Sequence, residues 1–282
     1  MPLSKLTKQW VAGKLPKRPR DANKGTFGKV LVIAGSENFP GAAYLSCAAS
    51  YRVGAGLVTL AIIPSVQTII SRKLPEVTFI SRDEIFGKIL NYDVLLVGPG
   101  LGQEEQAIKL VKKLLKENLP RMVIDADGLN ILSGFENWWE NLKTDCVLTP
   151  HPGEMSRLTG LSIDEIKADR ENITQKLARK WGKTVLLKGA NTVIASPNGQ
   201  VAASPFANPL LATAGTGDIL SGIIAGFIAQ GLNNFDAACC GVYLHGMAGE
   251  MMKEKIGDAG LLASDLLPIL PGTINSLKRG IK

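Results

Sequence analysis

Short apolar runs that end in glycine or in polar residues recur along this chain, and they constrain its fold more than any other feature. Counted with the loops that they enter, they lie at residues 29–35, 57–63, 77–80, 93–102, 122–130, 146–154 and 184–189. Strands this apolar that alternate with helices are typical of a parallel sheet covered on both faces. The pattern therefore predicts an α/β fold, a three-layer α/β/α sandwich with a mostly parallel central sheet, formed as a single domain over residues 1–282.

Helical patterns fill the intervals between several of these runs. They are predicted at residues 41–56, 103–118, 171–182, 217–230 and 236–256. In the segment 103–118 the acidic residues come first and the basic residues last, as the helix dipole favours. Between residues 192 and 204 the rhythm changes, because two short apolar runs flank the turn "SPNG". That segment predicts a β-hairpin.

The formal net charge is +7, and much of the excess lies in two basic runs, at residues 14–20 and 277–282. Basic runs can bind nucleic acid. No aromatic side chains lie within these two runs to stack on bases. We therefore interpret them as solvated ends and expect no nucleic-acid partner. A positive field also suits an anionic small substrate such as a nucleotide.

Cysteine usage and the apolar segments bear on the compartment. Four cysteines occur, none of them in a Cys-x-x-Cys pair: Cys47, Cys146, Cys239 and Cys240. We interpret them as buried thiols in a reducing cytoplasm. The first ten residues contain no apolar signal core. The apolar stretch 219–231 is too short to span a bilayer, so we expect a cytoplasmic protein with no membrane partner.

In an open parallel sheet, ligands bind outside the carboxyl ends of the strands. The loops at those ends lie at residues 35–43, 98–102, 125–130, 149–154, 188–192 and 212–218. In the last loop, Gly215 and Gly217 permit close approach of a ligand to the backbone, and a helix starts there. Asp218 follows at once. The arrangement indicates a phosphate site with a catalytic base; the alternative is that Asp218 only caps the helix.

Several of these loops carry specific motifs. "NPLLATAGTGDILSG" resembles the signature of the ADP/ATP-dependent NAD(P)H-hydrate dehydratases, a branch of the ribokinase-like fold. So do "KGTFGKVLVIAGSENFPGAAYLSCAASYRVGAGLV", "VGPGLG", "IDADGLN", "LTPHPGE" and "LLKGANTVIASPNG". The match runs in order from about residue 24 to about residue 270.

The resemblance implies a hydro-lyase that repairs nicotinamide cofactors. Its substrate would be the S epimer of the 6-hydroxylated hydrate of NADH or NADPH, and its co-substrate ADP or ATP. Asp218 would take the hydroxyl proton, and the oxygen would attack the terminal phosphate. Phosphate would then leave as the ring nitrogen pushes it out. A divalent cation, Mg²⁺, would neutralise the nucleotide phosphates.

The resemblance also assigns roles position by position. The hydrated cofactor is expected to contact Ala43, Gly102, His151 and Asp218. The nucleotide is expected to contact Lys188, Gly189, Ala190, Asn191, Thr192 and Gly217. Secondary polar roles fall to Asn208, Asp127 and Glu154. The metal ligands are left unassigned. Asp125 is as compatible with bracing a turn as with function, and His245 reads as packing or a hydrogen bond.

Three alternatives remain open at this point. A kinase of the same fold, acting on a vitamin or a sugar alcohol, would share Asp218 and the glycine turn but would leave a stable phosphate ester. A nucleotide-binding regulator would tolerate loss of the carboxylate. Nucleic-acid binding through the basic ends would depend steeply on salt. The sequence leaves ADP and ATP undecided, although ADP is favoured, and relatives suggest a homotetramer.

Overall fold

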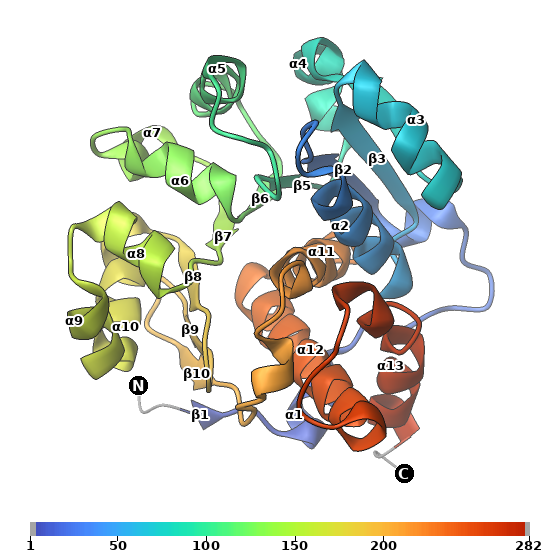
Figure 1. Cartoon of the computed structure of the whole chain (residues 1–282), viewed down its shortest axis with the longest axis vertical. Coiled ribbons are helices and arrows are strands. Elements are labelled where there is room, and N and C mark those ends of the chain that lie inside the picture. The colour runs from blue at the N-terminus through green and yellow to red at the C-terminus, as the bar shows by residue number, and fades with distance from the viewer. Residues whose placement is uncertain (1–3, 280–282) are drawn as a thin grey trace.

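The computed structural model describes residues 4–279, and a sheet of ten strands runs through its centre (Figure 1). The strand order is β1-β10-β9-β8-β7-β6-β5-β2-β3-β4. The strands are β1 (Ser4–Lys5), β2 (Lys29–Ile33), β3 (Leu57–Ile62), β4 (Thr78–Ser81), β5 (Val94–Val97), β6 (Arg121–Ile124), β7 (Cys146–Leu148), β8 (Thr184–Leu187), β9 (Val193–Ala195) and β10 (Val201–Ala203).

Parallel pairing dominates this sheet, as predicted. β2 pairs in parallel with both β3 and β5, with Val30 opposite Val58 and Val94. Only β9 runs the other way, pairing antiparallel with both β8 and β10. The predicted hairpin is confirmed, since Ala195 lies opposite Val201. Because the parallel strands share one direction, their carboxyl ends and the loops that follow meet at one edge.

Alternate residues of each strand point to opposite faces, and the two faces have separate cores. Val30 and Val32 of β2 pack into one core, and Leu31 and Ile33 into the other. The first core lies under α1 (Lys8–Lys14), α2 (Pro40–Arg52), α3 (Pro64–Lys73), α11 (Thr216–Ala229), α12 (Asn234–Ile256) and α13 (Leu270–Arg279). The second lies under α4 (Ile85–Lys88), α5 (Glu105–Leu114), α6 (Asp127–Ser133), α7 (Trp138–Asn141), α8 (Pro152–Thr159), α9 (Ile163–Ala168) and α10 (Arg170–Trp181). The three-layer prediction is confirmed.

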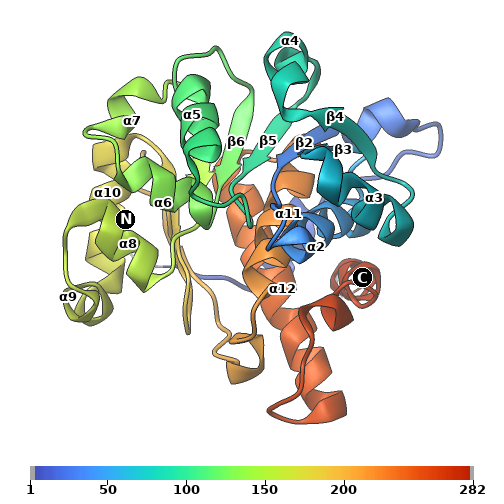
Figure 2. The ribbon, with the colours of Figure 1, turned by 45° about the horizontal axis from the view of Figure 1, so that its top comes forward.

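Helix α11 positions the loop that carries Asp218. It lies beside α2 and against the sheet, which Figure 2 shows from a second direction. Close approach of the two helices depends on small residues, because a Cβ at Gly222 would lie only 2.4 Å from the carbonyl oxygen of Ser46. Ser50 Oγ also donates to the Gly222 carbonyl at 2.9 Å. α11 is therefore held rigidly, with its first turn at the carboxyl edge of the sheet.

Other sequence predictions fare differently. The short helices α1, α3, α4, α6, α7, α8, α9 and α13 were not expected, and the run 277–282 is partly helical, since its first three residues close α13. Its last three residues lie outside the described part of the chain. All four cysteines are buried and free, as expected, and burial raises the pKa of the Cys146 thiol to about 12. Among the described residues, no helix has the length and apolarity needed to cross a membrane.

Candidate active site

A cavity of about 730 Å³ opens at the carboxyl edge of the sheet. It lies between the end of β8, the segment that leads into α11, and the middle of α12. Seven of the residues predicted from the sequence line it: His151, Lys188, Gly189, Ala190, Thr192, Asn208 and Gly217. Asp218 follows Gly217 directly. The structure therefore brings the nucleotide residues predicted from the sequence, Asn191 excepted, to one cavity.

The turn into α11 is built around glycine, and we call residues 215–218 the acid turn. Gly215 has φ +91°, a left-handed conformation that side chains rarely adopt. A Cβ at Gly215 would also lie 2.6 Å from Leu45 Cδ1. α11 starts at Thr216, so the first N–H groups of a 14-residue helix point toward the cavity edge. Free N–H groups and the positive end of the helix dipole together favour a phosphate there.

Asp218 lies in the first turn of α11, but it does not cap that helix. The N-cap residue is Gly215, and no side chain caps the turn. Among the described residues, no side chain or backbone group donates a hydrogen bond to the Asp218 carboxylate. Its pKa is raised to about 7, chiefly by burial and also by the nearby Asp125 carboxylate, against the opposing effect of Lys188. A carboxylate with that pKa accepts and releases a proton near neutral pH.

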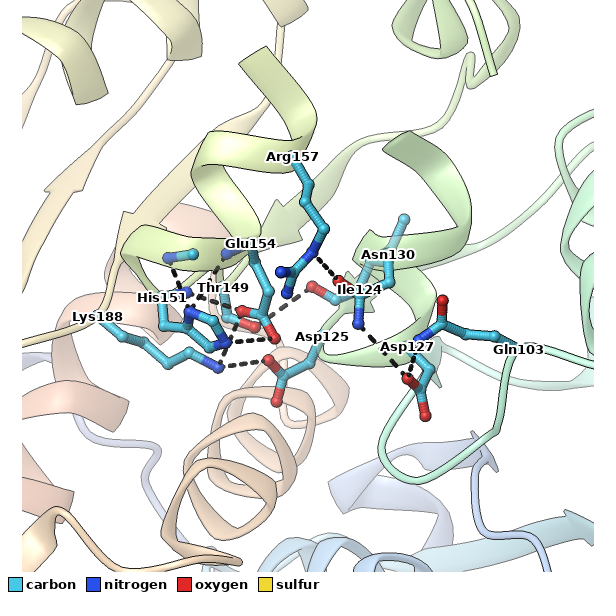
Figure 3. A network of polar contacts seen from close by, with 11 residues as sticks. Gln103, Ile124, Asp125, Asp127, Asn130, Thr149, His151, Glu154, Arg157 and Lys188 are labelled. Atoms are coloured by element: carbon cyan, nitrogen blue, oxygen red, sulfur yellow. Dashed lines mark hydrogen bonds and ion pairs between the residues drawn. The ribbon is translucent and has the colours of Figure 1, made fainter. Parts of the chain in front are cut away.

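Lys188, at the end of β8, joins the acid turn to a group of buried charges. Its Nζ lies 2.7 Å from Asp125 Oδ1 and 3.6 Å from Glu154 Oε2 (Figure 3). A Cβ at Gly217 would lie 3.6 Å from the same Nζ. Burial lowers the pKa of Lys188, but Asp125, Glu154 and Asp218 together outweigh burial and raise it. The ammonium is therefore held charged beside the acid turn.

His151 is the N-cap residue of α8. Its Nδ1 accepts hydrogen bonds from Gly153 N at 2.9 Å and from Glu154 N at 3.2 Å. Glu154 closes a capping box by accepting from His151 N at 2.8 Å, and its other oxygen lies 3.3 Å from His151 Nε2. With Nδ1 as acceptor, the neutral ring carries its proton on Nε2. Burial lowers the pKa of His151, and Lys188 lowers it further, so the neutral form persists.

We call Asp125, His151, Glu154 and Lys188 the strand-end network. Glu154 is buried, and burial raises its pKa, partly offset by Lys188. Asp125 is fully buried, yet its charge is matched by the ammonium 2.7 Å away. The sequence left open whether Asp125 braces a turn or has a functional role. Its carboxylate does not brace a turn; it holds the lysine at the cavity.

Asp127 points away from the network and orders the neighbouring loop. Its carboxylate accepts from Gly102 N at 3.0 Å and from Gln103 Nε2 at 3.1 Å. Between the two aspartates, Ala126 has φ +49°, an uncommon conformation for a residue with a side chain. Figure 3 shows Asp125 directed to Lys188 and Asp127 to Gln103. The conformation of Ala126 thus directs the two carboxylates to different partners, Asp125 to Lys188 and Asp127 to the loop at Gly102.

The remaining predicted residues occupy varied positions. Ala43 is buried in the first turn of α2, in contact with the turn at Gly35, and it does not line the cavity. Asn208 caps a short 3₁₀ turn through Oδ1, while its Nδ2 is buried without a partner among the described residues. Asn191 has φ +52°, and Thr192 Oγ1 donates to the Gly189 carbonyl.

Sequence reasoning missed two side chains at this edge. Arg170 donates from one nitrogen to the Leu187 carbonyl at 3.0 Å and to the Lys188 carbonyl at 3.4 Å, which fixes the end of β8. No motif marked it. The sequence analysis assigned His245 to packing or a hydrogen bond, and it is buried, but it also lines the cavity. Burial lowers its pKa to about 4, so it remains neutral there.

Comparison with known sequences supplies an independent finding. The family model described as NAD(P)H-hydrate dehydratase matches residues 30–272. A bifunctional NAD(P)H-hydrate repair enzyme from Moorella thermoacetica is 41% identical over 290 residues, which cover 98% of this chain and 55% of that protein. The chain spans about half the length of the bifunctional relatives that it matches. An ADP-dependent (S)-NAD(P)H-hydrate dehydratase from Neisseria meningitidis is 38% identical, covering 89% of this chain and 86% of that protein.

Comparison with solved structures agrees. The ADP/ATP-dependent NAD(P)H-hydrate dehydratase from Bacillus subtilis, co-crystallized with ATP and Mg²⁺, superposes with a TM-score of 0.87. It is 31% identical, and the match covers 98% of this chain and 99% of that one. A ribokinase-like superfamily protein from Enterococcus faecalis is similar to the same extent in structure, which confirms the ribokinase-like fold.

Proposed function

Because this chain belongs to the NAD(P)H-hydrate dehydratase family, we propose that it restores NADH or NADPH from the S epimer of the 6-hydroxylated hydrate, consuming ADP or ATP. The observation that carries the proposal is the state of Asp218. Its carboxylate has no hydrogen-bond donor among the described residues, its pKa is about 7, and it lies next to the helix N-terminus that suits a phosphate. A base and an anion site are therefore adjacent.

The proposed chemistry uses these two features in sequence. Asp218 removes the proton of the substrate hydroxyl, and the freed oxygen attacks the terminal phosphorus of the nucleotide, which breaks the bond to the bridging oxygen and releases AMP from ADP or ADP from ATP. The amide groups at the start of α11 stabilise charge on the transferring phosphoryl group. The phosphate ester is a better leaving group than hydroxide, so the ring nitrogen expels it. Loss of a proton from the adjacent ring carbon restores the double bond.

The two substrates are assigned to two parts of the site. We propose that the nucleotide contacts the cavity residues Lys188, Gly189, Ala190, Thr192 and Gly217, together with Asn191. Four of the five lie in the loop between β8 and β9, the start of which Arg170 fixes, and Lys188 supplies a charge that suits a phosphate. We propose that the hydrated cofactor contacts Ala43, Gly102, His151 and Asp218, with secondary support from Asn208, Asp127 and Glu154. Gly102 N donates to the Asp127 carboxylate and His151 N donates to the Glu154 carboxylate, and these hydrogen bonds support that grouping.

A magnesium ion fits this edge of the sheet by the chemistry of its donors. The described residues contain no preformed cluster of three or more metal-ligating side chains. Mg²⁺ does not need one, because it keeps waters and is commonly held by one or two carboxylates plus substrate phosphates. We propose that Asp125 and Glu154, which lie beside Lys188, supply those carboxylate oxygens. When bound, the ion would neutralise charge on the nucleotide phosphates.

One assay tests the proposal against its main rival. The protein is mixed with hydrated NADH or NADPH and with ADP or ATP, and recovery of the absorbance of the reduced nicotinamide is followed together with free phosphate. A dehydratase releases one phosphate for each cofactor restored. A kinase of the same fold would leave a stable ester and restore no absorbance. Absence of recovery with both nucleotides would overturn the proposal.

Three broader features belong to the same proposal. One continuous sheet with a core on each face supports a single domain. Four free, buried cysteines support a reducing cytoplasm. A homotetramer is proposed from the family resemblance alone, and sedimentation at micromolar protein concentration tests it.

A further inference from the structure

A second cavity, of about 260 Å³, lies at the far ends of the helices that carry the candidate active site. Its walls include Val53, which follows α2, and Gln230, which follows α11. Ala43 and Asp218 stand at the opposite ends of those two helices. The two cavities are therefore separated by the full length of α2 and α11.

Three cations from distant parts of the sequence line this cavity: Arg18, Arg52 and Lys278. Arg18 and Lys278 belong to the two basic runs that the sequence analysis treated as solvated ends. The fold joins those runs, because Lys278 Nζ donates to the Pro16 carbonyl at 2.8 Å. No aspartate or glutamate is among the described residues that line the cavity. The rim is thus positive, and the walls between the cations are apolar, formed in part by Leu15 and Phe227.

Arg18 is held in a fixed position at this rim. Its guanidinium lies 3.5 Å above the ring of Phe27. It also packs directly on Gly54, where a Cβ would lie 2.3 Å from one of its nitrogens. That nitrogen donates to the Gly54 carbonyl at 3.1 Å and to Gln230 Oε1 at 3.3 Å. The remaining N–H groups of a guanidinium, which has five, are left for another acceptor.

Cations also gather at helix C-termini merely to balance the helix dipole. The net charge at the rim shows whether these three cations do only that or leave positive charge for a ligand. The ends of α1, α2, α11 and α13 each contribute about −0.5 of a charge, or about −2 in all. Three side chains contribute +3, so about +1 remains uncompensated. The electrostatics at Lys278 agree, because burial lowers its pKa and the charge of Arg18 lowers it further. No acidic group offsets these effects there.

We propose that this cavity is a second ligand site for a compact anion with an apolar portion, such as the phosphate ester of a small organic molecule. Guanidinium and ammonium groups bind phosphate oxygens through charge-assisted hydrogen bonds. The apolar walls suit a short carbon or ring portion. The volume is about a third of that of the first cavity, which excludes a whole dinucleotide. The proposal does not depend on the dehydratase activity.

Phenyl phosphate is the probe, and isothermal titration calorimetry on the full chain is the measurement. The double variant Arg52→Gln/Lys278→Gln removes two exposed cations from the rim. The matched control Lys112→Gln/Lys116→Gln removes two exposed lysines around the end of α5. We expect the rim variant to bind phenyl phosphate at least about tenfold more weakly than the control, because two charge-assisted contacts are lost. Benzyl alcohol, which lacks the charge, should not bind measurably.

Three results would overturn the site. One is equal binding by the rim variant and the control. Another is full displacement of phenyl phosphate by ADP with no effect of the rim variant, which would place the binding in the first cavity. The third is an absence of binding to the unchanged chain at millimolar probe. If the double variant does not fold, Arg52→Gln alone serves, since no hydrogen bond or ion pair from Arg52 is present among the described residues.

Discussion

The two sides of the candidate active site use charge in opposite ways. In the strand-end network every charged group has a partner: Lys188 lies between Asp125 and Glu154, and Glu154 caps the backbone at His151. In the acid turn, which lies beside Lys188, Asp218 has no hydrogen-bond donor among the described residues, and its pKa is about 7. The strand-end network is therefore a fixed set of contacts, whereas the acid turn is suited to exchange a proton.

The two sides are nevertheless coupled. Asp125 raises the pKa of Asp218 after burial has done so, and Lys188 opposes both. Through its charges, the network therefore sets the proton affinity of the base. Mutations on the two sides should separate, with losses of chemistry from the acid turn and losses of stability or shifts of pH dependence from the network. Four predictions test that separation, starting with the largest effect.

The largest effect is expected from Asp218→Asn. An amide of the same shape cannot take the proton, and a general base contributes about 10²- to 10⁴-fold to a rate. Turnover of the hydrated cofactor should therefore fall by about that factor. Folding and nucleotide affinity should be retained, because the carboxylate makes no hydrogen bond that the fold needs. Steady-state kinetics and calorimetric titration with ADP measure the two quantities.

The control for this variant is Asp145→Asn, which alters an exposed aspartate far along the chain. It should leave turnover unchanged. Turnover of Asp218→Asn within threefold of that control would remove Asp218 from the chemistry. The acid turn would then be a structural feature only, and the contrast with the network would disappear.

The second prediction concerns stability. Lys188→Met leaves the buried carboxylates of Asp125 and Glu154 without their cation, and breaking a buried ion pair from one side costs about 3–5 kcal/mol. Urea denaturation should show that loss in the free energy of unfolding. Lys183→Met is the matched control, because Lys183 is buried but, among the described residues, donates only to the Thr144 carbonyl. The control should cost about 1 kcal/mol.

Equal losses in the two lysine variants would contradict the network, since the two carboxylates would then contribute nothing specific. A loss smaller than that of the control would likewise mean that the fold does not depend on the contacts of Lys188 with the two carboxylates.

The third prediction is a change in pH dependence. Asp218 must be deprotonated to act as a base, so turnover should fall as the pH drops through the pKa of Asp218, about 7. Asp125→Asn removes a like charge and frees Lys188, and both effects lower the pKa of Asp218. The acidic limb of the rate profile should therefore move to lower pH, by about one unit. Glu154→Gln should move it less, since Glu154 acts more weakly on Asp218.

A limb that stays in place in both variants would show that the network does not tune the base. A limb that moves to higher pH would indicate that loss of Asp125 buries Asp218 more deeply, which reverses the proposed sign.

These same residues show how much of the site could be predicted from the sequence. The parallel sheet alone predicts that loops distant in sequence meet at one edge, so Lys188, Gly217 and Asn208 could be placed at one cavity in advance. The partner of Lys188 could not, because Asp125 lies 63 positions away and their contact depends on the order and register of β6, β7 and β8. The contact between the two basic runs could not be predicted either, because the sequence showed no recognisable helical pattern at α1 or α13.

The structural role of His151 was also not predicted from the sequence, and this residue supplies the fourth prediction. The sequence predicted a substrate-binding histidine in a loop, whereas the structure makes it the N-cap of α8. His151→Ala should lower the free energy of unfolding by about 1 kcal/mol through loss of the cap, and His151→Asn should restore most of it, because asparagine is a good N-cap residue. Thermal unfolding measures this. If the ring also binds the hydrated cofactor, the Michaelis constant should rise in both variants alike. A Michaelis constant that asparagine restores would make capping the only role of His151, and the cofactor would then be held by Gly102, Ala43 and the acid turn.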